Sequence, residues 1–379
     1  MHIKAHRYNQ GFSLVELLVG MAMGVIVLLI ILQALSVAEQ YKRTTTSGSD
    51  AQINGLMALR AMEAEIRMAG YGMTNNANLC PSINSYYDGT LTSITGMPVK
   101  IVDGGTGSDS IEIVYSSSFN AAAPTRITTA MPIPSNVTRV SNLAGINTCD
   151  FVLYAAKDGS KACTMLQVTG KNSNNLQFLT GSGQSDYNPP GGFNGALFPP
   201  GGYTTNDIII NMGSFVDKRF SVNKTASKDE YFLRQTKVNS ADDGCNPVDP
   251  NPDLDMISNI VNIQAQYGVA PTSSQQVDCW TSAAATNTGC SITTGSNWSN
   301  PPTADVQRIK AIRVAIVVRS ALSEKPSSTG GSCDTTTAAP TSWNGGPTIN
   351  LSSISNWQCY RYKVYQTVIP IINVIWANT

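Results

Sequence analysis

The stretch that decides the fold lies at the N-terminus, in residues 7–32, RYNQGFSLVELLVGMAMGVIVLLIIL. A short polar and basic leader leads to Gly11, and an apolar run follows from Phe12 to Leu32. The run matches the roughly 20 residues that a helix needs to cross the hydrocarbon core of a bilayer. We therefore expect a transmembrane helix over residues 12–32.

The leader, residues 1–11, differs from an ordinary secretory signal. Such a signal has a shorter apolar region and is cut after it, whereas here the change from polar to apolar sequence precedes the run. Residues 11–16, GFSLVE, resemble the class III leader of type IV prepilins. The resemblance implies that a prepilin peptidase cuts between Gly11 and Phe12 and that the new N-terminus at Phe12 is methylated. The apolar helix would then stay on the mature protein.

Glu16 is a carboxylate inside the apolar run. A charged side chain at the bilayer centre costs roughly 2.5 to 3.5 kcal/mol on insertion scales, so a compensating interaction is expected. The resemblance implies that Glu16 pairs with the amino group of Phe12 on a neighbouring subunit and sets the axial register of a filament. The alternative is stabilisation by the dipole of its own helix. Gly20 and Gly24 have the spacing of a helix-packing motif.

Charge and composition exclude several classes of function. The chain has 25 basic and 25 acidic residues, and loss of Lys4 and Arg7 with the leader leaves 23 basic residues against 25 acidic ones. This balance gives no electrostatic basis for nucleic-acid binding. Both histidines, His2 and His6, also lie in the leader. A mature chain without histidine excludes His-dependent triads and Cys/His dyads, so we expect neither enzymatic activity nor a cofactor.

The orientation and the cysteines point to export. Lys4 and Arg7 precede the apolar run, and positive residues stay in the cytoplasm, so the large C-terminal part is expected outside it. Eight cysteines without a C-x-x-C pair favour disulfides in an oxidising compartment over a zinc site. They are Cys80, Cys149, Cys163, Cys245, Cys279, Cys290, Cys333 and Cys359.

Sequence separation favours one set of disulfides. The pairs Cys149–Cys163, Cys279–Cys290 and Cys333–Cys359 would each close a short polar loop, which leaves Cys80 for Cys245. Eight cysteines allow 105 connectivities, so other pairings stay open. Residues 270–304 and 323–347 are rich in small polar residues and are expected to form long surface loops held by disulfides.

Residues 33–70 continue the helical pattern beyond the membrane. Large apolar residues recur at spacings of three and four, which predicts one long helix whose apolar face packs on a globular domain. They are Ile53, Leu56, Met57, Leu59, Met62 and Ile66. Residues 44–49, TTTSGS, have low helix propensity, so a kink or frayed turn is expected there. Gly70 and Gly72 are expected to end the helix.

Residues 71–379 carry short extended patterns separated by turn residues, which predicts a β-rich head domain. Residues 308–319 are almost continuously apolar or β-branched, as in a central strand that is buried on both faces. Residues 362–376 are expected to form the last strand, with Pro370 at an edge or bulge. The fold class is therefore α+β, with a long N-terminal helix packed on a β-rich head whose loops are closed by disulfides.

Two segments are weak candidates for binding. PPGG turns at residues 189–192 and 199–202 flank Phe193 and Phe198, and an exposed loop there would present these rings to a partner. An acidic region offers oxygen ligands to calcium through Asp249, Asp253 and Asp255, next to Asp242 and Asp243. It lacks the spacing of an EF-hand, so a solvated loop is the alternative and no metal is assigned.

Four segments beyond the leader resemble PilW-type minor pilins of type IV pili. Residues 67–71, RMAGY, are similar to the R-x-A-G-[YF] end of the family's N-terminal helix. Residues 259–269, NIVNIQAQYGV, are similar to its strand that ends in Y-G-V. Residues 309–319, IKAIRVAIVVR, and 362–373, YKVYQTVIPIIN, resemble the two strands that follow. Gln33 stands where many major pilins have proline, which implies a minor subunit.

The resemblance implies a pilin-like fold and a structural role. We expect a minor pilin in a tip or priming complex that initiates pilus polymerisation. Its expected partners are other minor pilins and the major pilin, through the N-terminal helix, together with a pilus-tip adhesin and the prepilin peptidase. It would first be a single-pass inner-membrane protein with a periplasmic head, and later part of the pilus. A minor pseudopilin of a type II secretion system and an adhesive module that binds through residues 182–204 or 323–347 are the alternatives.

Overall fold

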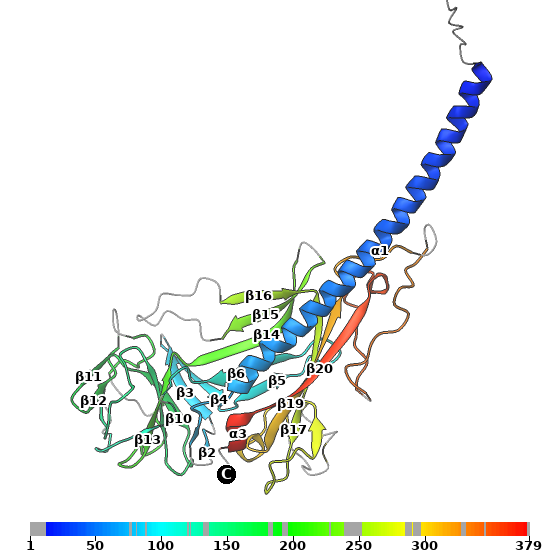
Figure 1. Cartoon of the computed structure of the whole chain (residues 1–379). Coiled ribbons are helices and arrows are strands. Elements are labelled where there is room, and N and C mark those ends of the chain that lie inside the picture. The colour runs from blue at the N-terminus through cyan, green and yellow to red at the C-terminus, as the bar shows by residue number, and fades with distance from the viewer. Residues whose placement is uncertain are drawn as a thin grey trace, which may run out of the picture.

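One long helix enters a β-rich head in the computed structural model (Figure 1). The structure describes residues 13–75, 78–80, 82–87, 89–119, 121, 123–131, 136–180, 185–191, 196–226, 229–238, 252–284, 290, 297–326, 331–344 and 346–376. The helix α1 (Leu14–Met68) projects from the head over its first half and lies against the sheets over its second half (Figure 1). The predicted α+β class is confirmed.

The head contains several sheets. The first has the order β4-β3-β10-β9-β13-β7 and is formed by β3 (Ser82–Tyr87), β4 (Thr90–Thr95), β7 (Thr125–Arg126), β9 (Phe151–Ala155), β10 (Cys163–Gln167) and β13 (Ile208–Gly213). The second has the order β16-β15-β14-β6-β5 and is formed by β5 (Val99–Val102), β6 (Ser110–Tyr115), β14 (Val216–Lys224), β15 (Tyr231–Lys237) and β16 (Asp253–Ser258). The third has the order β18-β17-β19-β20 and is formed by β17 (Ile260–Val269), β18 (Cys279–Thr281), β19 (Ile309–Arg319) and β20 (Tyr362–Pro370).

Smaller elements complete the head. A three-stranded sheet is formed by β8 (Val137–Arg139), β11 (Gly170–Asn172) and β12 (Asn175–Gln177), and β1 (Thr74–Asn75) pairs with β2 (Asn78–Leu79). Short helices are α2 (Thr303–Val306), a 3₁₀ turn η1 (Trp357–Cys359) and α3 (Ile372–Trp376). These elements connect the sheets and do not change the β-rich character of the head.

The second half of α1 packs on the third sheet and on the edge of the second. Its closest neighbours are β19 and β20, with further contacts to β6, β16 and α3. This arrangement buries one face of the helix in the main core, which also contains β17 and β19 residues such as Ile263 and Val314. The helix is therefore an integral part of the head from about residue 47 onwards.

The predicted frayed turn at residues 44–49 is wrong, because α1 is continuous through this segment. Tertiary contacts hold the weak helix formers in place. Ser47 is buried against the head, and the Thr44 hydroxyl donates a hydrogen bond to Glu324 Oε1 at 3.2 Å. Intrinsic propensity is a weak preference that such contacts override.

A second core lies inside residues 127–209, apart from the helix. It fills the space between the first sheet and the three-stranded sheet. Tyr154 on β9 lies at its centre, with ring centroids of Phe178, Phe198 and Tyr203 within 5.8 Å. Alternate residues of β9 face the two cores, since Leu153 belongs to the main core and Val152 to the second. This explains why β9 is buried along its whole length.

The two C-terminal strands follow the prediction in part. β19 lies between β17 and β20 and is buried on nearly every residue, so the predicted central strand is confirmed. β20 is an edge strand that ends at Pro370, whereas Ile372–Trp376 form α3. The prediction of a strand up to residue 376 is therefore wrong. Pro370 has no N–H to donate to a further ladder, and the chain turns after it.

The structure describes three disulfides. Cys279–Cys290 and Cys333–Cys359 are the pairs predicted from sequence. The predicted pairs Cys80–Cys245 and Cys149–Cys163 are wrong, because Cys80 is bonded to Cys163. Cys80 precedes β3, and β3 pairs in parallel with β10, which begins at Cys163. This long-range pairing brings the two Cα atoms to 5.6 Å. Cys149 is also disulfide-bonded, and Cys245 lies outside the described residues.

Candidate functional site

The first half of α1 is a free apolar surface. Every large apolar side chain from Leu14 to Leu35 is at least half exposed. The helix is long and apolar enough to cross a membrane. At roughly 1.5 Å per residue, the stretch Leu14–Leu35 rises about 33 Å, which is close to the thickness of a hydrocarbon core. No part of the head that the structure describes covers this surface, which is suited to contact with a membrane or with other helices.

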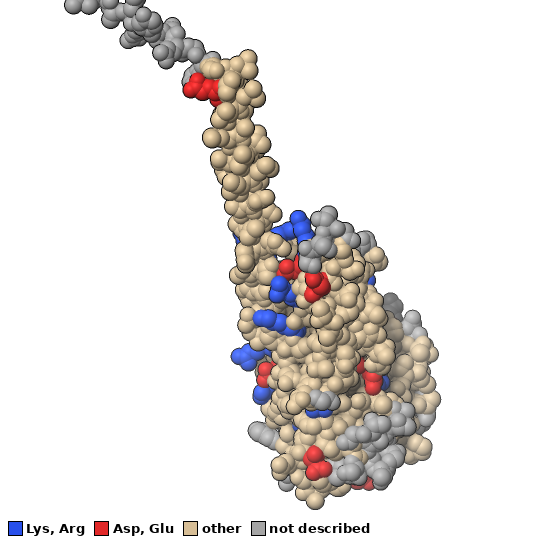
Figure 2. All heavy atoms as spheres, turned by 90° about the vertical axis from the view of Figure 1, so that its right-hand side faces the viewer, with Lys and Arg blue, Asp and Glu red and all other residues tan. Residues whose placement is uncertain are grey.

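Glu16 is the only charged residue between Ser13 and Ala38. It lies in the first turn of α1, which begins with Ser13 as N-cap. Figure 2 shows an acidic group at the free end of the helix, far from the basic groups of the head. No described residue forms an ion pair with Glu16, although the dipole of α1 favours an anion at this end. Gly11 and Phe12, the predicted cleavage site and pairing partner, lie outside the described residues.

Gly20 and Gly24 lie one turn apart on the free half of α1. A Cβ at either position would meet nothing within 4 Å. The pair therefore leaves a shallow depression that is open to a neighbouring helix, as small residues do in membrane helix pairs.

Small residues and then two large ones dock the second half of α1 on the head. The buried positions of the helix are Ser47, Ala51, Gly55, Ala58, Met62 and Ile66. Ile53, Leu56 and Met57 were predicted to face the head, but they are 52%, 54% and 56% exposed. Met62 and Ile66 are buried as predicted. The prediction is wrong for the other three residues, because small residues at Ala51, Gly55 and Ala58 let the helix backbone approach the strands closely. Their own spacing of three and four was the signal in the sequence that could have shown this.

The closest approach occurs at Gly55. A Cβ there would lie 2.3 Å from Cδ2 of Tyr365 on β20 and 3.0 Å from Cγ2 of Val318 on β19. Glycine is therefore required where the Tyr365 ring crosses the helix. This contact fixes the height of the helix above the third sheet.

The end of α1 is tied to the C-terminal helix of the head. Gly70 has a φ of 80°, a conformation that favours glycine and ends the helix as predicted. The side-chain amide of Asn373 donates to the carbonyls of Met68 and Ala69 at 3.2 and 3.0 Å. Arg67 Nη2 lies 2.7 Å from Glu63 Oε1 one turn earlier. Orphan carbonyls at the helix end are thus satisfied by a residue about 300 positions away.

The segments that resemble the pilin family meet in space. Residues 67–71 contact Asn373 at the end of the fourth segment, while the other three segments lie in β17, β19 and β20 of one sheet. The hydroxyl of Tyr267 accepts a hydrogen bond from the Ile101 N–H at 2.6 Å, which joins the second and third sheets. These segments therefore form one unit around the docked half of α1.

Two protein-family models match the chain. A family model described as Type IV Pilus-assembly protein W matches residues 219–373, and a model described as Prokaryotic N-terminal methylation motif matches residues 6–32. These two matches support a PilW-type pilin of a type IV pilus. No curated protein and no solved structure matches it. The match to the PilW model begins in β14 of this pilin, so the lobe built on the second core lies outside the matched residues.

Two of the weak calcium candidates, Asp253 and Asp255, form ion pairs. Arg234 donates to Asp255 Oδ1 at 2.8 Å and to Asp253 Oδ2 at 3.0 Å. Hydrogen bonds from Arg234 lower the pKa of Asp255. Both carboxylates are thus committed to a guanidinium, and they do not support the calcium hypothesis. Asp242, Asp243 and Asp249 lie outside the described residues.

The proposed aromatic contact loop of the pilin is part of its interior. Phe198 is 2% exposed in the second core, and Tyr203 beside it is 1% exposed. Phe193 lies outside the described residues. The prediction that Phe198 is presented to a partner is therefore wrong. Residues 196–203 fold inwards because the aromatic rings supply the core of this lobe.

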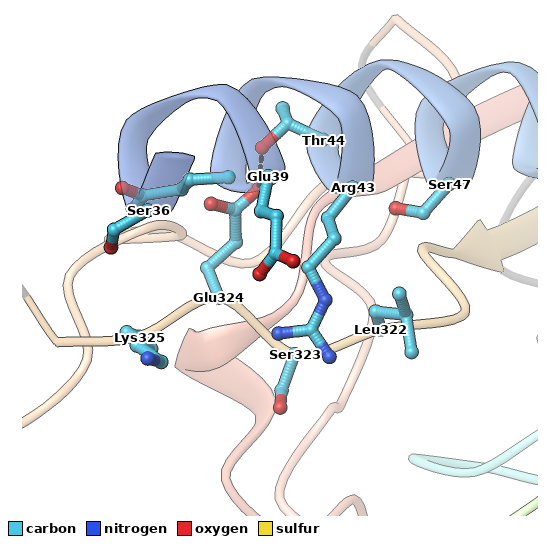
Figure 3. A pocket seen from close by; sticks show the side chains of 10 residues that line it. Ser36, Glu39, Arg43, Thr44, Ser47, Leu322, Ser323, Glu324 and Lys325 are labelled. Carbon is cyan, nitrogen blue, oxygen red and sulfur yellow. Dashed lines mark hydrogen bonds between the residues drawn. The ribbon is translucent and has the colours of Figure 1, made fainter. Parts of the chain in front are cut away.

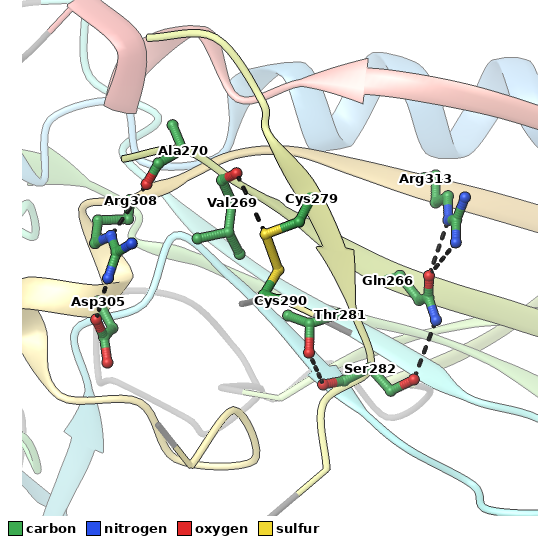
Figure 4. Close-up of a disulfide and its surroundings, with 10 residues drawn as sticks. All are labelled: Gln266, Val269, Ala270, Cys279, Thr281, Ser282, Cys290, Asp305, Arg308 and Arg313. Carbon is green, nitrogen blue, oxygen red and sulfur yellow. Dashed lines mark hydrogen bonds and ion pairs between the residues drawn. A yellow bond between two sulfur atoms is a disulfide. The ribbon is translucent and has the colours of Figure 1, made fainter. Parts of the chain in front are cut away.

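A disulfide and an arginine hold the loop around β18 in place in this pilin (Figure 4). Cys279 on β18 is bonded to Cys290, next to the last residues of β17. Arg313 on β19 donates to Gln266 Oε1, and its guanidinium lies 5.1 Å from the Trp280 ring and 4.2 Å from the Trp343 ring. The side chains around the Cys279–Cys290 disulfide contact one another, so we interpret the disulfide as structural.

Two buried carboxyl groups shape the electrostatics of the second sheet. Burial raises the pKa of Asp217 on β14 to about 7, and its Oδ1 has no hydrogen-bond partner among the described residues. Burial also raises the pKa of Asp109 to about 6, although Asp109 accepts backbone hydrogen bonds from Gly104 and Ala265 at 2.9 and 2.8 Å. A carboxyl pKa raised by burial makes the free energy of unfolding depend on pH.

Sequence reasoning missed a polar cleft between α1 and the loop after β19. Figure 3 shows Arg43 and Glu39 extending from the helix towards residues 322–325, while Glu324 extends back to Thr44. The cleft holds a volume of about 80 Å³. No sequence pattern predicts it, because the loop and the helix are almost 280 residues apart.

Proposed function

We propose that this minor pilin joins other minor pilins in a tip or priming complex that starts pilus polymerisation. The supporting observation is the free half of α1, an apolar surface with a single acid in its first turn. Such a surface suits packing among the helices of like subunits. The large lobe on the second core adds bulk to the head, and bulk is easier to accommodate at a filament end than in every repeat.

Register between subunits would come from Glu16. Its carboxylate would pair with the amino group of Phe12 on the neighbouring subunit after cleavage at Gly11. A buried carboxylate without a partner is strongly unfavourable, so a subunit would enter the helical bundle only at the axial position that supplies the cation. The open depression at Gly20 and Gly24 would let that helix approach closely.

Before assembly the pilin would span the inner membrane with its head in the periplasm. The disulfides of the head fit an oxidising compartment, and the basic leader fits retention on the cytoplasmic side. We infer that the protein is structural and has no enzymatic activity. Its partners would be other minor pilins, the major pilin and a tip adhesin.

The role is tested by counting pili in cells that lack the gene and are also blocked in retraction. We expect few pili without the protein and normal numbers when it is restored. Antibody against the head should label pilus ends. Normal pili in the deletion strain, together with lost protein secretion, would favour the pseudopilin alternative. Label spread along the shafts would contradict a role at the tip.

A further inference from the structure

The polar cleft lies where α1 enters the head. Its helix wall consists of residues one turn apart on a single face, and its other wall is the loop after β19. The helix contributes Ser36, Glu39, Gln40, Arg43, Thr44 and Ser47, and the loop contributes residues 322–325. The volume of about 80 Å³ is suited to one small polar group rather than to a peptide.

The charges in the cleft favour an anion. Glu324 is already neutralised, because Arg361 Nε donates to its Oε1 at 2.8 Å and the Thr44 hydroxyl donates at 3.2 Å. Arg43 and Lys325 form no hydrogen bond or ion pair with any residue that the structure describes. Glu39 is the one remaining acid among the lining residues. Two uncommitted cations therefore face one uncommitted carboxylate.

The position of the cleft matches the surface of the membrane that α1 spans. The apolar run of α1 ends at Leu32 and is followed by Gln33, and the cleft begins three residues later at Ser36. Tyr41 lies in the same stretch of helix as the residues that line the cleft and is 72% exposed. Aromatic side chains of this kind are enriched at the bilayer interface. Figure 2 shows basic groups gathered along the side where the helix enters the head.

Apolar side chains continue from the cleft towards the bilayer. Leu32 and Leu29 precede Ser36 by four and seven residues, so they lie on the same face of α1. Both are 53% exposed. Leu322 at the mouth of the cleft is 44% exposed. A molecule with a polar head in the cleft would find an apolar path for its chains along the helix.

We propose that the cleft binds the phosphate group of a phospholipid in the leaflet next to the head. Arg43 and Lys325 contact the phosphate oxygens, and the acyl chains lie along Leu32 and Leu29. The inference rests on membrane anchoring, but not on a tip role or on filament register. The bound lipid holds the head close to the bilayer before assembly, and it must leave when neighbouring helices cover this face.

The test is lipid binding by the full chain in detergent, measured by native mass spectrometry. A short-chain phosphatidylglycerol is the probe, and a diacylglycerol with the same chains controls for apolar binding. We expect Arg43→Gln to weaken phosphatidylglycerol binding about fivefold and Arg43→Gln with Lys325→Gln more than tenfold. Lys42→Gln, an equal charge change on a neighbouring residue that does not line the cleft, should leave binding within about twofold.

Three outcomes would overturn the proposal. Equal weakening by Lys42→Gln and Arg43→Gln would mean general attraction to the helix surface. Equal binding of the diacylglycerol would mean that the phosphate is not recognised. Displacement of the lipid by an equal concentration of inorganic phosphate would mean a site for free anions.

Arg43 and Lys325 are exposed, so the variants should melt at the wild-type temperature, and Arg43→Lys should restore most of the binding.

Discussion

The ring of Tyr365 on β20 lies directly against Gly55 of α1, so close that a Cβ at Gly55 would be 2.3 Å from its Cδ2. This contact joins α1 to the edge strand of the third sheet. Gly55 is one of six buried positions through which the head holds α1. The orientation of the membrane span relative to the head follows from this packing.

Gly55→Ala should destabilise the docked half of α1. The added methyl group must displace the Tyr365 ring or lift the helix, and overpacking of this kind costs about 1 to 3 kcal/mol. The measurement is the denaturation midpoint of the full chain in detergent, with tyrosine fluorescence as a second readout.

Gly48→Ala is the matched control for that substitution. Gly48 lies on the same helix, and a Cβ there meets nothing within 4 Å. Alanine should therefore stabilise α1 by about 0.5 to 1 kcal/mol. If the Gly55→Ala protein were as stable as the Gly48→Ala protein, the close contact between Gly55 and Tyr365 would not exist.

The Cys80–Cys163 disulfide should contribute more stability than the Cys279–Cys290 disulfide. The first closes a separation of 83 residues and the second a separation of 11. The entropy of loop closure predicts about 4 to 5 kcal/mol for the longer loop and about 3 kcal/mol for the shorter one. Double Cys→Ser variants of each pair, compared by chemical denaturation under oxidising conditions, measure the difference. An equal loss of unfolding free energy in the two double variants would contradict this prediction.

Asp217 should make the head less stable as the pH rises. Burial raises its folded-state pKa to about 7, from an ordinary value of 3.8, so the folded state binds more protons than the unfolded state between these values. The free energy of unfolding then falls with rising pH across that window, by about 1 kcal/mol per pH unit for one such group. Asp109 acts in the same direction up to about pH 6.

Asp217→Asn should remove this dependence. The variant should exceed wild type in stability at pH 8, and the difference should be smallest below about pH 3, where the wild-type carboxyl is protonated in both states. Asp50→Asn is the control, because Asp50 is exposed on α1 and should change neither the stability nor its slope. Parallel pH profiles for wild type and Asp217→Asn would show that the carboxyl is not held protonated by burial.

Long periodic patterns made much of this fold predictable. The transmembrane run, the helix to Gly70 and the buried strand β19 each extend over ten or more residues of one pattern, and the structure has all of them. The family resemblance was likewise readable from short runs that prove to meet around the docked helix, as in the contact of Asn373 with Ala69.

The errors concern contacts between distant segments. The face that α1 presents to the head was assigned to large residues such as Leu56, whereas close packing selects Ala51 and Gly55. The disulfide of Cys80 depends on the parallel pairing of β3 with β10, which separation along the chain does not reveal. Local propensity also gave no hint that Thr44 would be held in the helix by Glu324.

The central claim is that Glu16 is an assembly contact, and its most direct test compares Glu16→Val in the membrane with Glu16→Val in sheared pili. The substitution should leave processing and membrane levels unchanged but lower the amount in pili at least about tenfold, because loss of one member of a buried ion pair costs several kcal/mol. Asp50→Val, on the same helix but outside the apolar run, should enter pili normally. Normal incorporation of Glu16→Val would contradict the account.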